Sequence, residues 1–143
     1  MAGKYSPAAQ QKLASYELFM NDVARIHNLC EQFAVAKSGA DNFKAALKRA
    51  AGMAKLKFMT SGKAQLSQIC GAIELQSSRS GAQGAMARAL REHVGNLRFQ
   101  IDLEMRLIIK EDQEEMHAKK VAKEKAKLSV ERHAAEQKRE SSE

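Results

Sequence analysis

Apolar residues recur every three or four positions over four stretches of the chain, the period of a helix that buries one face. The stretches cover residues 7–36, 42–59 and 63–77, and the fourth begins at 82. Polar or glycine-containing segments at 37–42, 60–63 and 77–81 interrupt the pattern. We therefore predict an all-α protein, an antiparallel four-helix bundle with short connections.

The expected core positions follow from these periods. The first helix carries a broad apolar stripe, which predicts contact with two neighbouring helices. We expect these side chains to face the core: Leu13, Tyr16, Met20, Val23, His27 and Cys30 in the first helix, flanked by Phe19, Ile26, Leu29 and Phe33; Phe43, Leu47, Ala50, Ala54 and Phe58 in the second; Leu66, Ile69, Cys70 and Ile73 in the third; Met86, Leu90, Val94, Leu97, Ile101, Met105 and Ile108 in the fourth.

Local signals mark the helix starts. Ser6 stands directly before the chain's single proline, and this order predicts an N-cap followed by a first-turn proline. We expect Ser38 or Asp41 to cap the second helix. Ser80 followed by Gln83 predicts a capping box, in which the glutamine side chain reaches back to the serine backbone N–H.

The fourth helix is expected to continue past its core stripe, because no breaker follows Ile108. We predict a bundle over residues 1–109 and a charged helical extension over 110–143 with a frayed C-terminus. The extension holds nine basic and nine acidic residues, so the chain's net charge of +7 does not come from it. Acidic residues gather at 111–115 and lysines at 119–127.

The extension carries half of a coiled-coil seam. Val121, Leu128 and Ala135 recur every seven residues, but two of the three companion positions, 118, 125 and 132, are charged. This half seam is too weak to drive a dimer alone. Two interpretations stay open: a solvated helix end, or an assembly arm that uses Lys119, Lys123, Lys127, Val121 and Leu128.

The positive charge concentrates in residues 37–63, which hold seven basic residues and one acidic residue. Lys44, Lys48 and Lys55 fall within about 40° on one flank of the second helix. Arg91 and Arg98 share a flank of the fourth helix. If the two flanks adjoin, they form a basic groove for nucleic acid or an acidic partner. Solvated lysines around an amphipathic helix are the alternative.

The sequence lacks the other signs of specific nucleic-acid recognition. No aromatic residues alternate with the bases as a stacking platform, and no helix-turn-helix, RNA-recognition or zinc-finger signature is present. Any nucleic-acid binding is therefore expected to be non-specific.

The second helix also has a second apolar side. Met53, Leu56 and Met59 point away from its core face, which indicates either a partner-binding surface or burial on two sides. A membrane partner is not expected, because the core requires the main apolar face of this helix. The full set of candidate contact residues is Lys44, Lys48, Arg49, Lys55, Leu56, Met59, Arg91 and Arg98.

Catalytic and metal-binding patterns are incomplete. His27, Cys30 and Glu31 lie within one turn but lack a further Cys or His cluster for zinc. Glu114-x-x-His117 is only one of the two such motifs that a di-iron bundle needs. No phosphate loop or nucleophile elbow is present. We expect a non-enzyme without a metal or cofactor.

The two cysteines, Cys30 and Cys70, lie inside apolar-periodic segments and are expected to be buried, reduced thiols. No secretory signal or membrane-length apolar run is visible, so we expect a soluble intracellular protein. The leading functional hypothesis is a non-enzymatic assembly subunit that docks to protein partners through its second helix and its arm. A homo-oligomer is compatible with this hypothesis. The alternative is non-specific nucleic-acid binding through a basic groove on the bundle.

Overall fold

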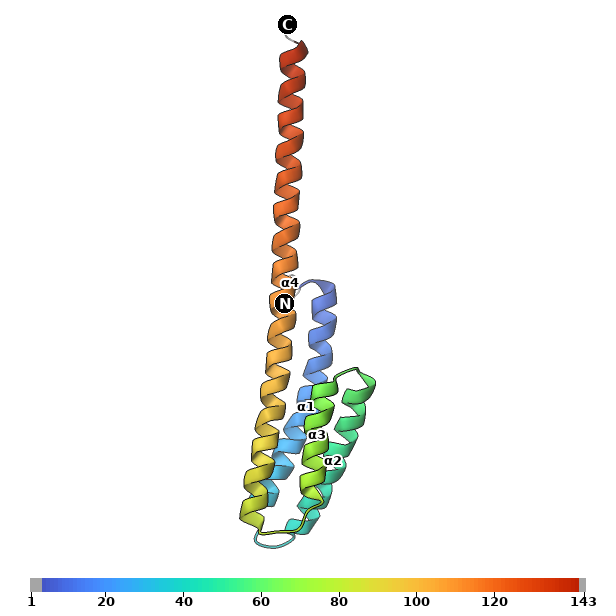
Figure 1. The fold of residues 1–143 in the computed structure, drawn as a ribbon, viewed down its shortest axis with the longest axis vertical. Helices are drawn as coiled ribbons and strands as arrows, with labels where there is room; N and C mark the ends of the chain where they lie inside the picture. Colours follow the sequence, from blue (N-terminus) through green and yellow to red (C-terminus); the bar gives the residue numbers. More distant parts are fainter. Residues whose placement is uncertain (1–3, 142–143) are drawn as a thin grey trace.

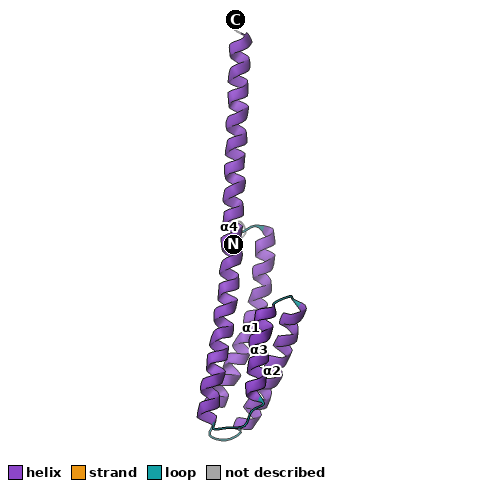
Figure 2. Cartoon of the chain, in the orientation of Figure 1, coloured by secondary structure: helices purple, strands orange, loops and turns teal. Residues whose placement is uncertain are grey.

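The structure, a computed structural model, describes residues 4–141 and contains four helices and no strand in that range (Figures 1 and 2). The helices are α1 (Pro7–Val35), α2 (Ala40–Thr60), α3 (Ala64–Ser77) and α4 (Gln83–Ser141). α1 contacts α2 and α4, and α3 contacts the same two helices. The predicted all-α bundle is confirmed, and α2 and α4 occupy opposite corners of it.

The start of α1 matches its sequence signal, whereas the start of α2 does not. The Ser6 side chain accepts a hydrogen bond from the backbone N–H of Ala9 at 3.2 Å, as an N-cap does. The prediction that Ser38 or Asp41 caps α2 is wrong. Gly39 holds that position with a φ of 72°, and it makes no side-chain cap bond. A left-handed residue is needed there because the chain must reverse within four residues of the end of α1, and glycine adopts that conformation without strain.

The predicted capping box at the start of α4 is also wrong. The Gln83 side chain does not bond Ser80 but donates to the backbone oxygens of Phe33 and Ala36, at 2.7 and 2.8 Å. These carbonyls lie at the end of α1, where the last carbonyl oxygens of a helix have no N–H donor in a following turn. Gln83 therefore ties the first turn of α4 to the last turn of α1.

The core lies where all four helices overlap. The expected core residues of α2, α3 and α4 are buried, apart from Phe43, Ile69, Met105 and Ile108, which are partly buried against the core. On α1 the centre of the stripe differs from the prediction: Phe19, Ile26 and Phe33 are buried, whereas Leu13 and His27 are half-buried and Met20 is exposed. α1 faces both α2 and α4, so its buried face is centred between them. Phe19 meets Phe58 of α2 edge to face, with ring centroids 4.9 Å apart.

α4 continues as one helix well past the bundle, as predicted (Figure 1). Its last buried residue is Asp112, whose carboxylate accepts hydrogen bonds from the backbone N–H of Ser6, at 3.0 Å, and from the Ser6 hydroxyl. Residues 113–141 form what we call the arm, about 43 Å long at 1.5 Å per residue. The last two residues of the predicted extension, 142 and 143, lie outside the described residues. Among residues 4–141, no helix is both long and apolar enough to cross a membrane.

Candidate functional site: two exposed surfaces

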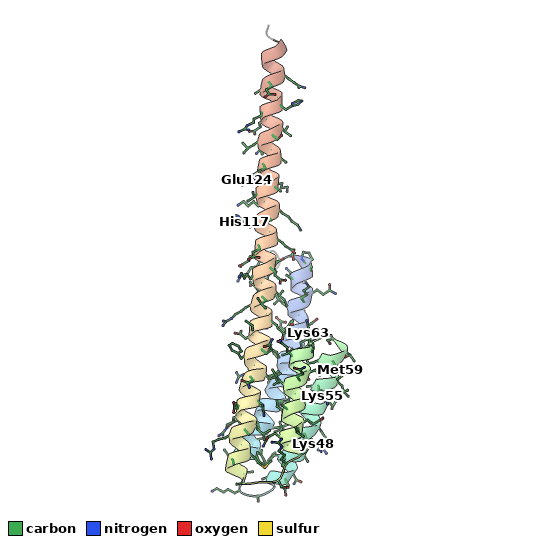
Figure 3. The ribbon with its side chains drawn as sticks, in the orientation of Figure 1. Lys48, Lys55, Met59, Lys63, His117 and Glu124 are labelled. Atoms are coloured by element: carbon green, nitrogen blue, oxygen red, sulfur yellow. The ribbon has the colours of Figure 1, made fainter. Side chains whose placement is uncertain are left out.

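The first candidate surface is the side of α2 that faces away from the core. Leu47, Ala54 and Phe58 are buried, whereas Met53, Leu56 and Met59 on the other side are 68, 61 and 56 % exposed. The open question from the sequence is therefore answered, because α2 is not buried on two sides within the described chain. We call this surface the α2 outer face, made up of Lys48, Arg49, Gly52, Met53, Lys55, Leu56 and Met59. Figure 3 shows Lys48, Lys55 and Met59 at successive heights along it.

A hollow of about 470 Å³ opens on this face, bordered on the far side by Glu74 of α3. Glu74 pairs with Lys55 at 3.6 Å, and its carboxylate fills the space that a Cβ on Gly52 would occupy. Neither Lys48 nor Arg49 belongs to the ion pairs among the described residues. The hollow thus offers exposed apolar surface beside two cations that have no acidic partner of their own.

The basic groove that the sequence suggested is not formed. α2 and α4 do not contact one another, because they lie at opposite corners of the bundle. The flank of α2 turns toward α3, where Lys44 donates to the backbone oxygen of Arg79 and Lys55 pairs with Glu74. The condition on which the groove depended, adjacent flanks on α2 and α4, is therefore not met.

The arginine flank of α4 turns toward α1 instead. Arg91 binds the Glu31 carboxylate through two nitrogens, at 2.9 and 2.8 Å. This bond to the guanidinium lowers the pKa of Glu31. Arg98 lies about two turns farther along α4 and lines the same pocket as Arg91. The pocket has a volume of about 220 Å³ and is also lined by His27 and Cys30. Half of the predicted arginine pair is thus already neutralised by an internal partner.

The second candidate surface belongs to α4, and the sequence analysis missed part of it. Phe99, Leu103 and Leu107 are 67, 39 and 48 % exposed on the side of α4 that faces away from the bundle. Their spacing of four residues was visible in the sequence, but the stronger core stripe at 94, 97 and 101 overlaps it. We call Phe99, Leu103, Leu107, Val121 and Leu128 together the α4 outer stripe.

The predicted arm residues divide between two sides of the helix. Lys119, Lys123 and Lys127 follow one another at four-residue steps and form one exposed row. Val121 and Leu128 lie roughly opposite that row, in line with Phe99 farther down α4. Val121 is half-buried and Leu128 is 56 % exposed. In Figure 3, His117 and Glu124 mark the lower half of the arm, above the start of α1.

The described residues contain no group of three His, Cys, Asp or Glu side chains placed to hold a metal ion. Cys30 and Cys70 are buried and carry no disulfide, and burial raises their pKa values to about 11 and about 12. Thiols with such pKa values are poor nucleophiles at neutral pH, because the thiolate is the reactive form.

One polar cluster lies near the point where α1 and α4 extend beyond the shorter helices α2 and α3. The Tyr16 hydroxyl donates to a Glu104 oxygen at 3.2 Å, and the Lys63 ammonium lies 5.0 Å from the centre of the tyrosine ring. Burial is the main cause of the raised pKa of Tyr16. The second carboxylate oxygen of Glu104 is buried without a partner among the described residues.

Comparison of the chain with protein-family models, curated proteins and solved structures gave no significant match.

Proposed function

We propose that the chain is a non-enzymatic assembly subunit that docks to protein partners through the α2 outer face and the arm. The observation that carries this proposal is the arm, a helix that runs about 43 Å beyond the last core contact. The arm packs against no other helix of the described chain, whereas most helix stability in proteins comes from packing. Its internal ion pairs contribute little, because only Glu115–Lys119 stands in the favourable order four residues apart. A partner that packs against the arm supplies the missing contacts.

The α2 outer face supports the same proposal from the other end of the molecule. Met53, Leu56 and Met59 form a continuous exposed apolar ridge, and such ridges with a polar rim are typical of protein interfaces. Lys48 and Arg49 on the rim favour a partner with acidic residues around an apolar anchor.

The experiment is affinity capture of the tagged full-length chain from a native lysate, with and without nuclease. Two variants address the two surfaces, Leu56→Asp on α2 and Val121→Glu combined with Leu128→Glu on the arm. Leu75→Asp on α3 is the matched control, since Leu75 is equally exposed (58 %) but outside both surfaces. We expect a nuclease-resistant protein partner that is lost with a surface variant and kept with the control. A monomeric chain that captures no protein refutes the proposal.

Non-specific nucleic-acid binding is the second candidate, and the excess of basic residues over 37–63 favours it. Lys48 and Arg49 on α2 would carry it, together with Lys44, Lys55, Arg91 and Arg98. Lys44 and Lys55 lie on α2, whereas Arg91 and Arg98 lie on α4, and these two helices do not contact one another. The four residues therefore do not line one continuous groove. Binding to duplex or single strands should weaken steeply between about 50 and 200 mM salt. Absence of binding at low salt removes this candidate.

A further inference from the structure

We propose that two copies of the chain pair in antiparallel orientation, with the arm of each copy lying along the α4 outer stripe of the other. This pairing rests on the proposed function and names the partner of the arm. It starts from the position of the five stripe residues on α4. At 100° per residue, they fall within an arc of about 80°, on the side opposite Leu97 and Ile101. The stripe is thus one surface with a lower half on the bundle and an upper half on the arm.

The two halves match in length. The part of α4 that belongs to the bundle covers residues 83–112, and the arm covers residues 113–141. These segments differ by one residue, so an arm lying antiparallel to α4 of a second copy spans nearly the whole of that copy's bundle portion. No other helix obstructs this side, because α1 and α3 contact α4 on its buried side and the stripe residues of the bundle are exposed.

The apolar residues also match in register. With residue 114 of the two copies placed opposite each other, Leu107 of one copy faces Val121 of the other. The same register places Phe99 opposite position 129, one residue or about 1.5 Å from Leu128. Leu103 faces Lys125 in this register, so the apolar match is between Leu107 and Val121 and between Phe99 and Leu128.

The charges beside the stripe are complementary in this register. Asp102 and Arg106 form an exposed ion pair at 2.9 Å on one flank of α4. Glu124 and Lys127 lie on the same flank of the arm, and a two-fold axis brings like flanks together. Asp102 then lies within one position of Lys127, and Arg106 within two positions of Glu124. The two copies therefore present opposite charges along this edge of the seam.

A parallel pair lacks this complementarity. It would place each residue of the seam opposite itself, so Glu114, Lys125 and Arg132 would each meet their own copies. The antiparallel register keeps one of these contacts, Glu114 against Glu114 at the two-fold axis. One like-charge contact is less unfavourable than three, so charge favours the antiparallel orientation.

Cysteine cross-linking tests both the pairing and its direction. We would prepare Leu107→Cys and Val121→Cys separately and oxidise each alone and in an equal mixture. In the proposed register the mixed pair faces across the seam, within the Cα separation of about 4.4–6.8 Å that a disulfide spans. The two identical sites are offset by the fourteen residues between 107 and 121, about 21 Å along the helix. The native thiols, Cys30 and Cys70, are buried and leave a low background.

We expect a mixed disulfide dimer in the combined sample and little dimer in either single sample. Dimers in the single samples without a mixed product indicate parallel pairing and overturn the proposal. Leu75→Cys on the exposed side of α3 gives the rate of chance collision. Mixed product no faster than this control overturns it as well.

Sedimentation velocity on the untagged full-length chain gives an independent measurement. We expect concentration-dependent dimerisation that Leu107→Glu weakens at least about ten-fold in Kd, because the carboxylate would face Val121, whereas Leu75→Glu leaves Kd unchanged. A chain that stays monomeric up to about 100 μM overturns the pairing. If that monomer still captures another protein through the arm, the proposed function stands without the pairing. A dimer with the expected cross-links that captures no other protein supports the pairing, and the assembly is then one of identical subunits.

Discussion

Leu97 and Phe99 stand two residues apart on α4 but face opposite directions, and the contrast between them tests the orientation of the helix. Leu97 is fully buried, whereas Phe99 is 67 % exposed. Alanine at position 97 removes a side chain from the centre of the core. Alanine at position 99 removes a larger side chain that contacts little in a single copy. Hydrophobicity alone therefore predicts the larger loss at Phe99, and the structure predicts the reverse.

The magnitudes are well separated. A fully buried leucine replaced by alanine loses about 2–5 kcal/mol, from lost transfer energy and the cavity left behind. An exposed substitution away from special features changes stability by less than about 0.5 kcal/mol. A domain of this size has a total stability of about 5–15 kcal/mol, so Leu97→Ala removes a large fraction of it. With a central loss of about 3.5 kcal/mol and a urea dependence of about 2 kcal/mol per M, its midpoint falls by about 2 M.

The assay is urea unfolding followed by far-ultraviolet circular dichroism, at a concentration where sedimentation shows only monomer. Phe99→Ala should unfold within experimental error of the wild-type midpoint, and Leu97→Ala far below it. The buried Tyr16 gives a second probe, because its fluorescence reports tertiary packing rather than helix content. An equal or larger shift for Phe99→Ala would refute the assigned faces of α4 and, with them, the exposed stripe.

Three further predictions concern the fold. Cys30 and Cys70 should react with a thiol reagent at about pH 8 only as fast as the protein unfolds, since burial raises both pKa values; rapid labelling of the native chain would contradict their burial. Gly95→Ala should raise stability by about 0.5–1 kcal/mol in thermal unfolding, because a Cβ there meets nothing within 4 Å; a decrease would show a contact that the structure lacks. Hydrogen bonds from Ser6 lower the pKa of Asp112, so its stabilisation is complete above the ordinary carboxyl value of about 4 and is lost as pH falls through the lower folded value. The melting-temperature advantage of wild type over Asp112→Asn should therefore shrink below about pH 4, and a constant gap would argue against the bond.

The helices and most of the core could be predicted from the sequence because periodicity is a local property. The core positions Leu47, Ala54 and Phe58 can be predicted from the sequence, because the prediction requires only that one face of the helix is buried. The roles of Gly39 and Gln83 could not be predicted in this way. Gln83 bonds carbonyls at residues 33 and 36, a choice that depends on where the end of α1 lies in space. A local capping rule pairs Gln83 with a neighbour in the sequence, whereas in the fold the carbonyl oxygens at the end of α1 are better placed to accept its hydrogen bonds.

For the candidate surfaces too, some features follow from the local sequence and others depend on how the helices are arranged. The exposure of Met53, Leu56 and Met59 follows from the angle between them and the core stripe, which the sequence contains. The basic groove required α2 and α4 to be neighbours, and periodicity does not determine which helices adjoin. In a bundle in which each helix contacts the next in sequence, α2 and α4 lie on a diagonal. That arrangement places Lys48 and Arg91 on separate sides.

Asp112 marks the boundary between the two parts of α4, the part that packs in the bundle and the arm. It occupies the position where the core stripe would next require an apolar residue, and it instead binds the backbone and side chain of Ser6 at the start of α1. The bundle stops there because α1 begins there, not because α4 is broken. Beyond that point the helix lacks any core of its own within the described chain, so its order depends on what packs against it. In the proposed pair, association with a second copy and ordering of the arm are one coupled event, so the arm's helicity should rise with protein concentration while that of the bundle does not.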